Sequence, residues 1–361
     1  MKEENHNILI VAPSLDSARN VSGVSAVANF MIANNQECRY THFLQGKGDD
    51  EQGGLSRVVR LMKSYRRWKT LLNDLPADQI IHYNFPLDAM AVVRDFFFMN
   101  AARKQGRRMV VHIHGGLYLF RQDKPFLIKC LLNRIFRWDC PFIVLSTKEK
   151  QQIQTEYQTK TVYVLPNCVD LAVASSFTRK EFSPCLHLLF LGRIEPNKGM
   201  DYLYHAVKLL QDSGTDFILH FAGAEQGGND YIGSFSQLLG ERFVYEGVVS
   251  GIEKDKLLKT CDVFLLPSFY EGLPMSLLEC MSFGMIPVTT NVGSISEFVH
   301  DGKTGLLLQM KDSQSIVDAI NLLSKDTDLR RNLSKNAREK IFTTLNTENY
   351  IAKLNEIYQN C

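Results

Sequence analysis

Residues 186–199 read Leu186-His187-Leu188-Leu189-Phe190-Leu191-Gly192-Arg193-Ile194-Glu195-Pro196-Asn197-Lys198-Gly199. Six mainly apolar residues, typical of a buried strand, end in the pair Gly192-Arg193, and Lys198 follows where the next helical pattern opens. Ligands of open α/β sheets bind beyond the carboxyl ends of the strands, and a helix N-terminus with cations beside it attracts anions. The stretch therefore predicts a strand, a loop and a helix in which Arg193 and Lys198 hold a diphosphate. Two surface cations on an ordinary loop are the alternative.

On both sides of this stretch, apolar strand patterns alternate with helical patterns, as in proteins built on parallel sheets. In the first half, the expected strands cover residues 8–12, 79–83, 109–114, 142–146 and 161–165, with a helix over 23–33. In the second half, the expected strands cover residues 186–191, 217–222, 243–246, 263–267, 286–290 and 305–308, with an amphipathic helix over 313–323. The sequence thus predicts an α/β protein built on parallel sheets.

The length of 361 residues also favours two domains, because single hydrophobic cores rarely grow beyond about 250–300 residues. Turn-forming Pro166-Asn167 follows the last strand of the first half, and a polar, irregular stretch extends from there to Pro184. We therefore place a first domain at 1–168, a linker at 169–184 and a second domain at 185–345. The segment 346–361 contains a terminal helix, expected at 347–359, that we expect to return to the first domain.

The net charge of +2 is divided unevenly. Residues 1–168 contain 23 Lys and Arg against 15 Asp and Glu, whereas the rest of the chain contains 18 against 24. Residues 56–71 carry six basic and no acidic side chains, with apolar residues between them, beside a polar Gly-rich loop at 45–55. We interpret this charge as a site for an anionic membrane surface, with a solvated basic face as the alternative. No nucleic-acid-binding motif accompanies it, so nucleic acid is not an expected partner.

Further candidates for shallow membrane insertion lie in the same half, namely Phe96, Phe97, Phe98, Phe126, Leu127, Phe136 and Trp138. No apolar run approaches the ~18 residues needed to span a bilayer, and the N-terminus has no secretory pattern. We therefore expect a cytoplasmic protein, peripheral on the inner face of the membrane. The eight cysteines form no C-x-x-C pair, so neither a zinc site nor a disulfide framework is predicted.

A second informative stretch, residues 267–279, reads Pro-Ser-Phe-Tyr-Glu-Gly-Leu-Pro-Met-Ser-Leu-Leu-Glu after an apolar strand. Pro274 stands where a helix would begin, and Glu279 falls among apolar neighbours in that helix, where a carboxylate needs a partner. A ribose diol would supply two hydroxyl donors to Glu279, while Glu271 lies in the loop within reach of sugar hydroxyls. Backbone N–H groups around 272–275 suit phosphate oxygens. A helix cap with one structural ion pair is the alternative.

Taken together, these stretches resemble the retaining glycosyltransferase family 4 (glycosyl transferases group 1), which has the two-domain GT-B fold. The matching residues are Gly192-Arg193 with Lys198-Gly199, Glu271 and Glu279 with seven residues between them, and Asn291-Val292-Gly293-Ser294, Glu297, Asp301-Gly302 and Thr304-Gly305-Leu306-Leu307. The similarity is dense over about residues 163–310 and thinner before them. It implies two Rossmann-like domains whose parallel sheets face each other across a cleft.

The resemblance implies a role for each matching residue. Arg193 and Lys198 would bind the donor diphosphate and stabilise the leaving group. Glu271 would contact the donor sugar, Glu279 would bind the ribose, and the base would lie near Val249. Further donor contacts are implied for Gly192, Gly272, Leu273, Pro274 and Met275. No metal or other cofactor is expected, because the two cations do the work of Mg²⁺.

The first half would supply the acceptor side. Alternation along the strand at 109–114 puts His112 and His114 on one face. The resemblance places an active-site histidine at His114, whereas His112 is expected to be structural. Gly23 opens the first helix in a turn that resembles the family's Gly-rich turn, whose backbone faces the phosphates or the acceptor. Asp326-Thr327-Asp328 is formally a D-x-D motif, which we interpret as a helix cap rather than a metal site.

We therefore predict a hexosyltransferase-type glycosyltransferase that moves a sugar from a nucleotide-diphosphate-sugar to a hydroxyl of a sugar or lipid-linked saccharide acceptor. Retention at the anomeric carbon, and a role in surface polysaccharide or glycolipid assembly, come from the resemblance and the charge distribution. Two alternatives stay open, a sugar-nucleotide epimerase of the same fold and a non-catalytic nucleotide-sugar-binding subunit.

Overall fold

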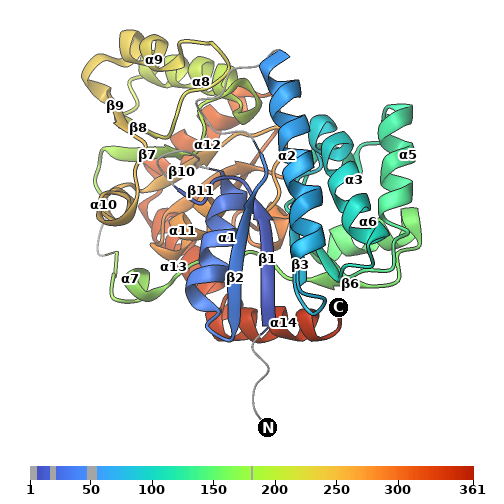
Figure 1. The fold of residues 1–361 in the computed structure, drawn as a ribbon. Helices are drawn as coiled ribbons and strands as arrows, with labels where there is room; N and C mark the ends of the chain where they lie inside the picture. The colour runs from blue at the N-terminus through green and yellow to red at the C-terminus, as the bar shows by residue number, and fades with distance from the viewer. Residues whose placement is uncertain (1–5, 17–21, 47–54, 180–181) are drawn as a thin grey trace. The chain divides into compact units, whose positions relative to one another are not determined.

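Two six-stranded parallel sheets organise the chain in a computed structural model, which describes residues 6–16, 22–46, 55–179 and 182–361. The chain divides into two units, Met1–Asn167 with Thr347–Cys361 and Cys168–Asn346 (Figure 1). Each unit contains one sheet with helices packed around it. The predicted α/β class with two parallel sheets is confirmed.

The first sheet has the strand order β2-β1-β3-β4-β5-β6, and every neighbouring pair is parallel. Its strands are β1 (His6–Ala12), β2 (Cys38–Leu44), β3 (Ile80–Phe85), β4 (Met109–Ile113), β5 (Phe142–Val144) and β6 (Val162–Val164). All but β2 fall at predicted positions. The sequence does not predict β2 because this edge strand, Cys-Arg-Tyr-Thr-His-Phe-Leu, is partly exposed and has no continuous apolar run.

The helices that precede the linker are α1 (Gly23–Asn34), α2 (Leu55–Asp74), α3 (Ala89–Lys104), α4 (Leu117–Phe120), α5 (Phe126–Ile135) and α6 (Thr147–Tyr157). Ser22 caps α1, because its hydroxyl accepts a hydrogen bond from Ser25 N at 3.3 Å. Buried Trp68 of α2 donates its Nε1–H to Phe98 O of α3 at 2.9 Å and so joins the two helices. The basic segment at 56–71 is therefore part of α2, whereas 47–54 of the expected loop lies outside the described residues.

The C-terminal helix α14 (Thr347–Gln359) is part of the first unit. Its buried Asn355 accepts a hydrogen bond from Asn35, the C-cap residue of α1, at 2.7 Å. Arg108 donates to Tyr358 O at 3.2 Å and to Cys361 O at 3.0 Å. These bonds fix α14 to the amino edge of the first sheet, because Arg108 immediately precedes β4.

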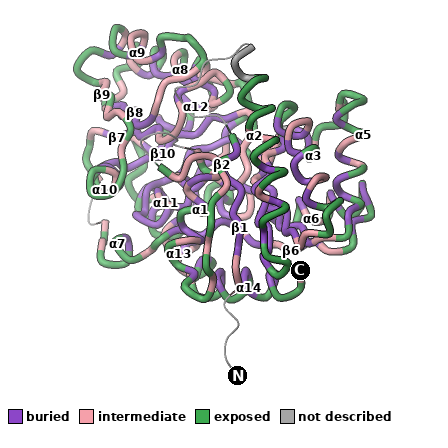
Figure 2. The backbone as a smooth tube through the Cα atoms, viewed as in Figure 1, coloured by how far each residue is buried: buried purple, intermediate pink, exposed green. Residues whose placement is uncertain are grey.

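The second sheet has the order β12-β11-β10-β7-β8-β9. Its strands are β7 (Leu186–Leu191), β8 (Phe217–Ala222), β9 (Phe243–Gly247), β10 (Val263–Leu266), β11 (Ile286–Thr290) and β12 (Leu306–Leu308). Strands β10 and β11 are buried along their whole length (Figure 2). The chain adds β8 and β9 on one side of β7 and then returns to add β10, β11 and β12 on the other. This reversal makes the carboxyl ends of β7 and β10 the expected ligand-binding edge.

The helices around this sheet are α7 (Ala172–Ser175), η1 (Pro196–Lys198), α8 (Met200–Asp212), α9 (Tyr231–Leu239), η2 (Gly240–Arg242), α10 (Gly251–Thr260), α11 (Met275–Ser282), η3 (Ile295–Glu297), α12 (Ser313–Lys325) and α13 (Thr327–Thr344). Asp326 is the N-cap of α13, and its carboxylate accepts a hydrogen bond from Leu329 N at 2.8 Å. The interpretation of the D-x-D sequence as a helix cap is therefore confirmed.

The burial of several aromatic side chains corrects the expectation about membrane insertion. Phe98, Phe136 and Trp138 lie in the hydrophobic core of the first unit and are at most 8% exposed, so they are not available for insertion. Phe126 and Leu127 on α5 are 83% and 57% exposed and stay available. In the parts of the chain that the structure describes, no helix is long and apolar enough to cross a membrane.

Candidate functional site

The two loops that follow β7 and β10 meet at the switch point of the second sheet. Lys198, which ends η1, places its Nζ 2.6 Å from Oε1 of Glu271 in the loop after β10. The backbone joins the same loops, because Phe269 N donates to Asn197 O at 3.0 Å. The side chains of Lys198 and Glu271 are 18% and 10% exposed, so the ion pair is largely shielded from water.

Two glycines allow the loops to approach this closely. Gly199 has a φ of +77°, and a Cβ there would lie 2.2 Å from Pro267 O. Gly293, in the loop after β11, has a φ of +58°, and its Cβ would lie 2.3 Å from Glu271 O. Any side chain at either position would both strain the backbone and push the Glu271 loop away. The backbone that carries Glu271 is thus held from both sides.

Arg193 is the second cation of this edge. It follows Gly192, whose N–H donates to Ala222 O at the end of β8 at 2.9 Å. Arg193 is partly exposed, and its guanidinium makes no hydrogen bond or ion pair with the described residues. An arginine with five unused donors at the carboxyl end of a strand is suited to an anionic ligand.

Glu279, predicted to need a partner, has one in the protein. Its Oε1 accepts a hydrogen bond from Lys254 Nζ on α10 at 2.7 Å. Burial opposes the charge of Lys254, but the carboxylate of Glu279 outweighs it and raises the pKa of Lys254 above its ordinary value. The ion pair that the sequence analysis left as an alternative therefore exists, and Lys254 is a site residue that the sequence reading missed.

The remaining predicted donor contacts lie around these pairs. Pro274 is the N-cap of α11, no side chain caps this helix end, and Met275 opens the helix as a buried residue. Gly272 O accepts from Ser294 N at 2.9 Å, which ties the loop before α11 to the loop after β11. Leu273 is 3% exposed. Val249 is partly buried between β9 and α10, just before the helix that carries Lys254.

In the first unit, His114 follows β4 at the carboxyl edge of the sheet. Its Nε2 lies 2.6 Å from Oδ1 of Asn84, whose Nδ2 donates to Val11 O at 2.9 Å. Because this second bond fixes the orientation of the amide, His114 Nε2 carries the proton and donates. Nδ1 is therefore an acceptor, and it is buried without a hydrogen-bond partner.

A buried row of polar side chains runs from His114 back to the C-terminal helix. The His112 ring lies 4.1 Å from that of His114 between centroids, and His112 Nδ1 is 3.2 Å from His82 Nε2. The hydroxyl of Tyr358 on α14 lies 2.8 Å from His82 Nδ1. The sequence signal for His82 and Tyr358 was weak, since each is a single polar group within an apolar pattern.

Burial keeps these imidazoles neutral. It lowers the pKa of His82 and of His114 to about 3. Burial, followed by the nearby His114 and His82, lowers the pKa of His112 well below its ordinary value. His114 is thus a neutral ring at neutral pH, one nitrogen of which is bound to Asn84 while the other lacks a partner.

Gly23 opens α1 at the carboxyl edge of the same sheet. A Cβ at this position would meet nothing within 4 Å, so packing does not demand glycine there. The structure thus brings Arg193, Lys198, Glu271 and Gly192 to one edge of the second sheet. It brings His114 and Gly23 to the corresponding edge of the first.

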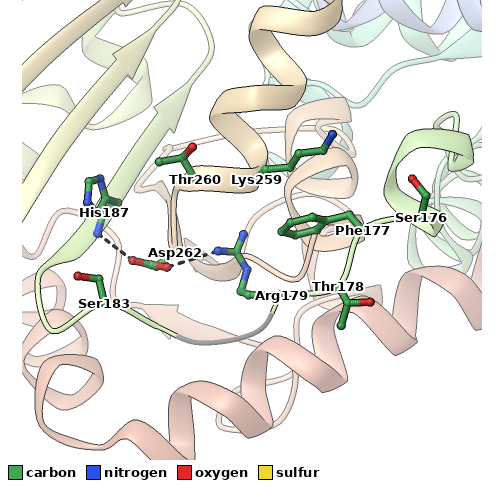
Figure 3. A pocket seen from close by; sticks show the side chains of 9 residues that line it. All are labelled: Ser176, Phe177, Thr178, Arg179, Ser183, His187, Lys259, Thr260 and Asp262. Atoms are coloured by element: carbon green, nitrogen blue, oxygen red, sulfur yellow. Dashed lines mark hydrogen bonds and ion pairs between the residues drawn. The ribbon is translucent and has the colours of Figure 1, made fainter.

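A cavity of about 710 Å³ lies at the opposite, amino edge of the second sheet (Figure 3). Asp262, just before β10, accepts from His187 N at 3.0 Å and lies 3.4 Å from a guanidinium nitrogen of Arg179. The carboxylate of Asp262 thus already forms an ion pair with Arg179 of this cavity. Since ligands of such sheets bind at the carboxyl edge, we do not assign the donor to this cavity.

Comparison with sequence families finds a match in the second unit. Residues 180–340 match the family model described as "Glycosyl transferases group 1". An Escherichia coli protein, UDP-Gal:alpha-D-GlcNAc-diphosphoundecaprenol alpha-1,3-galactosyltransferase, is 27% identical over 72% of this chain and 70% of its own length. A Campylobacter jejuni protein, N,N'-diacetylbacillosaminyl-diphospho-undecaprenol alpha-1,3-N-acetylgalactosaminyltransferase, is 32% identical over 42% of this chain and 39% of its own length.

Comparison with solved structures extends the similarity to the whole chain. Sucrose-phosphate synthase from Thermosynechococcus elongatus has a TM-score of 0.77 at 16% identity and covers 99% of both chains. Anabaena HepE, solved in complex with UDP and glucose, has a TM-score of 0.73 at 17% identity and covers 99% of this chain and 100% of its own. At these identities the likeness shows a common fold alone, an α/β fold built on two parallel sheets.

Proposed function

We propose that this chain, a glycosyltransferase of group 1 with the GT-B fold, transfers a hexose from a nucleotide-diphosphate-sugar to a hydroxyl of a lipid-linked saccharide, with retention at the anomeric carbon. One observation carries the donor part of this proposal. Arg193 and the Lys198–Glu271 pair lie on adjoining loops at the switch point of the second sheet. The acceptor part is supported by the two bacterial relatives, which are named for transfer to sugars on diphosphoundecaprenol.

The two cations of this edge act on the leaving group. Lys198 uses one of its three N–H donors on Glu271, which leaves two for oxygens of the donor diphosphate. The free guanidinium of Arg193 supplies further donors. Negative charge grows on the diphosphate as its bond to the sugar breaks, and fixed positive groups stabilise that charge without reorganising. The transfer therefore needs no metal ion.

The two carboxylates bind hydroxyl groups of the donor. Each keeps one oxygen on a lysine, Glu271 on Lys198 and Glu279 on Lys254, at 2.6 and 2.7 Å. The second oxygen of Glu279 accepts from the ribose hydroxyls, and that of Glu271 accepts from a hydroxyl of the sugar. A carboxylate only accepts hydrogen bonds, so this pair of side chains favours a ligand rich in hydroxyls.

His114 is proposed to contact the reacting sugar. Both of its nitrogens are turned away from solvent in this conformation, one to Asn84 and one into the protein. An unpaired buried acceptor costs about 1–3 kcal/mol, so a sugar hydroxyl that reaches Nδ1 would recover that energy while Nε2 stays on Asn84. The neutral ring that burial enforces can both accept and donate to hydroxyls.

We further propose that the enzyme works in the cytoplasm on the inner face of the membrane. The exposed side chains of Phe126 and Leu127 and the basic helix α2 support this location. A flotation assay with phosphatidylglycerol vesicles tests it. Binding at low salt that disappears at high salt is expected, and no binding at low salt would reject the membrane partner.

The experiment for the reaction itself is a panel of UDP-, GDP- and ADP-sugars in the presence of EDTA, with a prenyl-diphosphate-linked saccharide as acceptor. Product mass and anomeric configuration are read by mass spectrometry and NMR. The proposal expects one donor to give an α-linked product from an α-linked donor. Conversion of the donor sugar without an acceptor would indicate an epimerase, and donor binding without turnover on any acceptor would indicate a binding subunit.

A further inference from the structure

A second cavity, of about 560 Å³, lies in the first unit beside the carboxyl end of β2. Helices α2 and α3 form its other walls. It opens at the same edge of the first sheet as His114 and Gly23, because β2, β4 and β1 all run parallel and end there. This edge is the acceptor side of the proposed reaction.

Four cations line this cavity, and none of its lining residues is acidic. They are Arg60, Lys63 and Arg67 of α2 and Arg94 of α3. Arg94 is held by Asp95, with bonds of 2.6 and 2.9 Å, and is 20% exposed. Lys63 and Arg67 are exposed and make no side-chain hydrogen bond or ion pair with the described residues. The cavity therefore carries uncompensated positive charge.

The rim of the same cavity is apolar. Leu44 at the end of β2, Leu61 of α2 and Met90 of α3 line it and are 60%, 38% and 56% exposed. Exposed apolar side chains that gather beside polar groups are a feature of binding surfaces. A ligand that satisfies both parts of the cavity carries several negative charges and a hydrocarbon chain.

We propose that this cavity binds the diphosphate of the lipid-linked acceptor, with Lys63 and Arg67 on the diphosphate oxygens and Leu61 and Met90 against the first part of the lipid chain. This inference rests on the proposed function and extends it to the part of the acceptor that does not react. Cations fit this ligand because a diphosphate presents many acceptor oxygens at two neighbouring centres. The cavity is also larger than a diphosphate alone requires.

Two double variants of α2 test the proposal as a matched pair. Lys63→Gln with Arg67→Gln removes two charges from the cavity. Arg66→Gln with Lys69→Gln removes two charges from the same helix at exposed positions that do not line it. The change in net charge is the same in both variants, so general attraction to anions falls equally.

The first readout is transfer to two acceptors with the same saccharide, one on a short prenyl diphosphate and one on a methyl group. We expect the cavity variant to raise KM for the prenyl diphosphate acceptor about tenfold or more, as the loss of two charge-assisted contacts implies. The methyl glycoside should be used equally by all three proteins. Equal KM values of the two variants for the prenyl diphosphate acceptor would overturn the proposal.

The second readout is direct binding, measured by calorimetry with geranyl diphosphate, inorganic pyrophosphate and phosphatidylglycerol vesicles. It needs no turnover, so it separates failure of this inference from failure of the proposed reaction. Geranyl diphosphate should bind the wild type more tightly than pyrophosphate, and the cavity variant should lose more affinity for it than the control variant. Equal affinity for both anions, or vesicle binding without geranyl diphosphate binding, would overturn the assignment.

Discussion

Replacing Gly199 with alanine should separate the two loops of the donor site. The new Cβ would lie 2.2 Å from Pro267 O, and real Cβ contacts essentially never fall under 3.0 Å, so the loops must move apart by most of an ångström. Gly199→Ala therefore displaces Lys198 from Glu271, with which it now makes a 2.6 Å bond. A misplacement of about 1 Å in a positioned site costs roughly 100-fold in rate.

Gly214→Ala is the matched control. Gly214, before β8, has a φ of +74°, close to the +77° of Gly199, but its Cβ would meet nothing within 4 Å. In both variants, an alanine in the left-handed conformation lowers the free energy of unfolding by about 1–2 kcal/mol. Gly199→Ala should lose a further 1–3 kcal/mol, roughly, from overpacking.

The assay is urea unfolding together with kcat/KM for the donor. We expect Gly214→Ala to keep donor kcat/KM within about twofold of wild type, since it lies outside the site, while Gly199→Ala loses about 100-fold. Donor kcat/KM for Gly199→Ala equal to that of Gly214→Ala would refute the view that close packing of these loops positions the cations.

Three more predictions follow from the contacts of single residues. Glu279→Gln should leave Lys254 without its ionised partner and raise KM for the donor about 10- to 100-fold with little change in kcat, measured by steady-state kinetics. Tyr358→Phe leaves His82 Nδ1 buried and unpaired and should lower the free energy of unfolding by about 1–3 kcal/mol in urea titrations. The depressed pKa values of His82 and His112 mean that the unfolded chain takes up protons that the fold does not, so stability is complete above pH 6.5 and falls below it. For these two residues the loss is up to about 3 kcal/mol per pH unit, read from urea midpoints between pH 7 and 5. A flat profile would mean that both imidazoles take up protons in the fold as they do in the unfolded chain.

The sequence predicts most strands of both sheets because strands buried on both faces need continuous apolar runs. Strands β7, β8 and β11 begin and end at the predicted residues. Strand β2 escapes prediction because it lies at an edge, where one face stays exposed and polar residues are tolerated. Burial of Phe98, Phe136 and Trp138 is also not predicted, since composition does not tell which side chains of a segment face the core.

The predictable part of the site is the set of loop residues at strand ends. Parallel strands put all their carboxyl ends at one edge of the sheet, so the sequence alone predicts that Arg193, Lys198 and Glu271 lie close together. The direct bond between Lys198 and Glu271 could not be predicted, because it depends on side-chain rotamers and on how closely the two loops approach each other at Gly199.

Contacts between elements that are far apart in the sequence cannot be predicted in this way from the sequence. Glu279 required a partner by its burial, yet α10 offers Lys254, Lys256 and Lys259, and no spacing rule selects the first of them. Tyr358 and His82 are 276 residues apart in the chain, and only the return of α14 to the first unit makes them neighbours.

The role of Arg193 and Lys198 is tested most directly by the rate of sugar transfer in EDTA, measured for the wild type and for the double variant Arg193→Ala, Lys198→Ala. If these cations stabilise the leaving diphosphate in place of a metal, EDTA leaves the wild-type rate unchanged. The double variant then loses about 10³-fold or more, since a single preorganised donor contributes about 10²–10³. Loss of wild-type transfer in EDTA with recovery in Mg²⁺, or a double variant that transfers sugar normally, would show that these cations do not replace a metal at the leaving group.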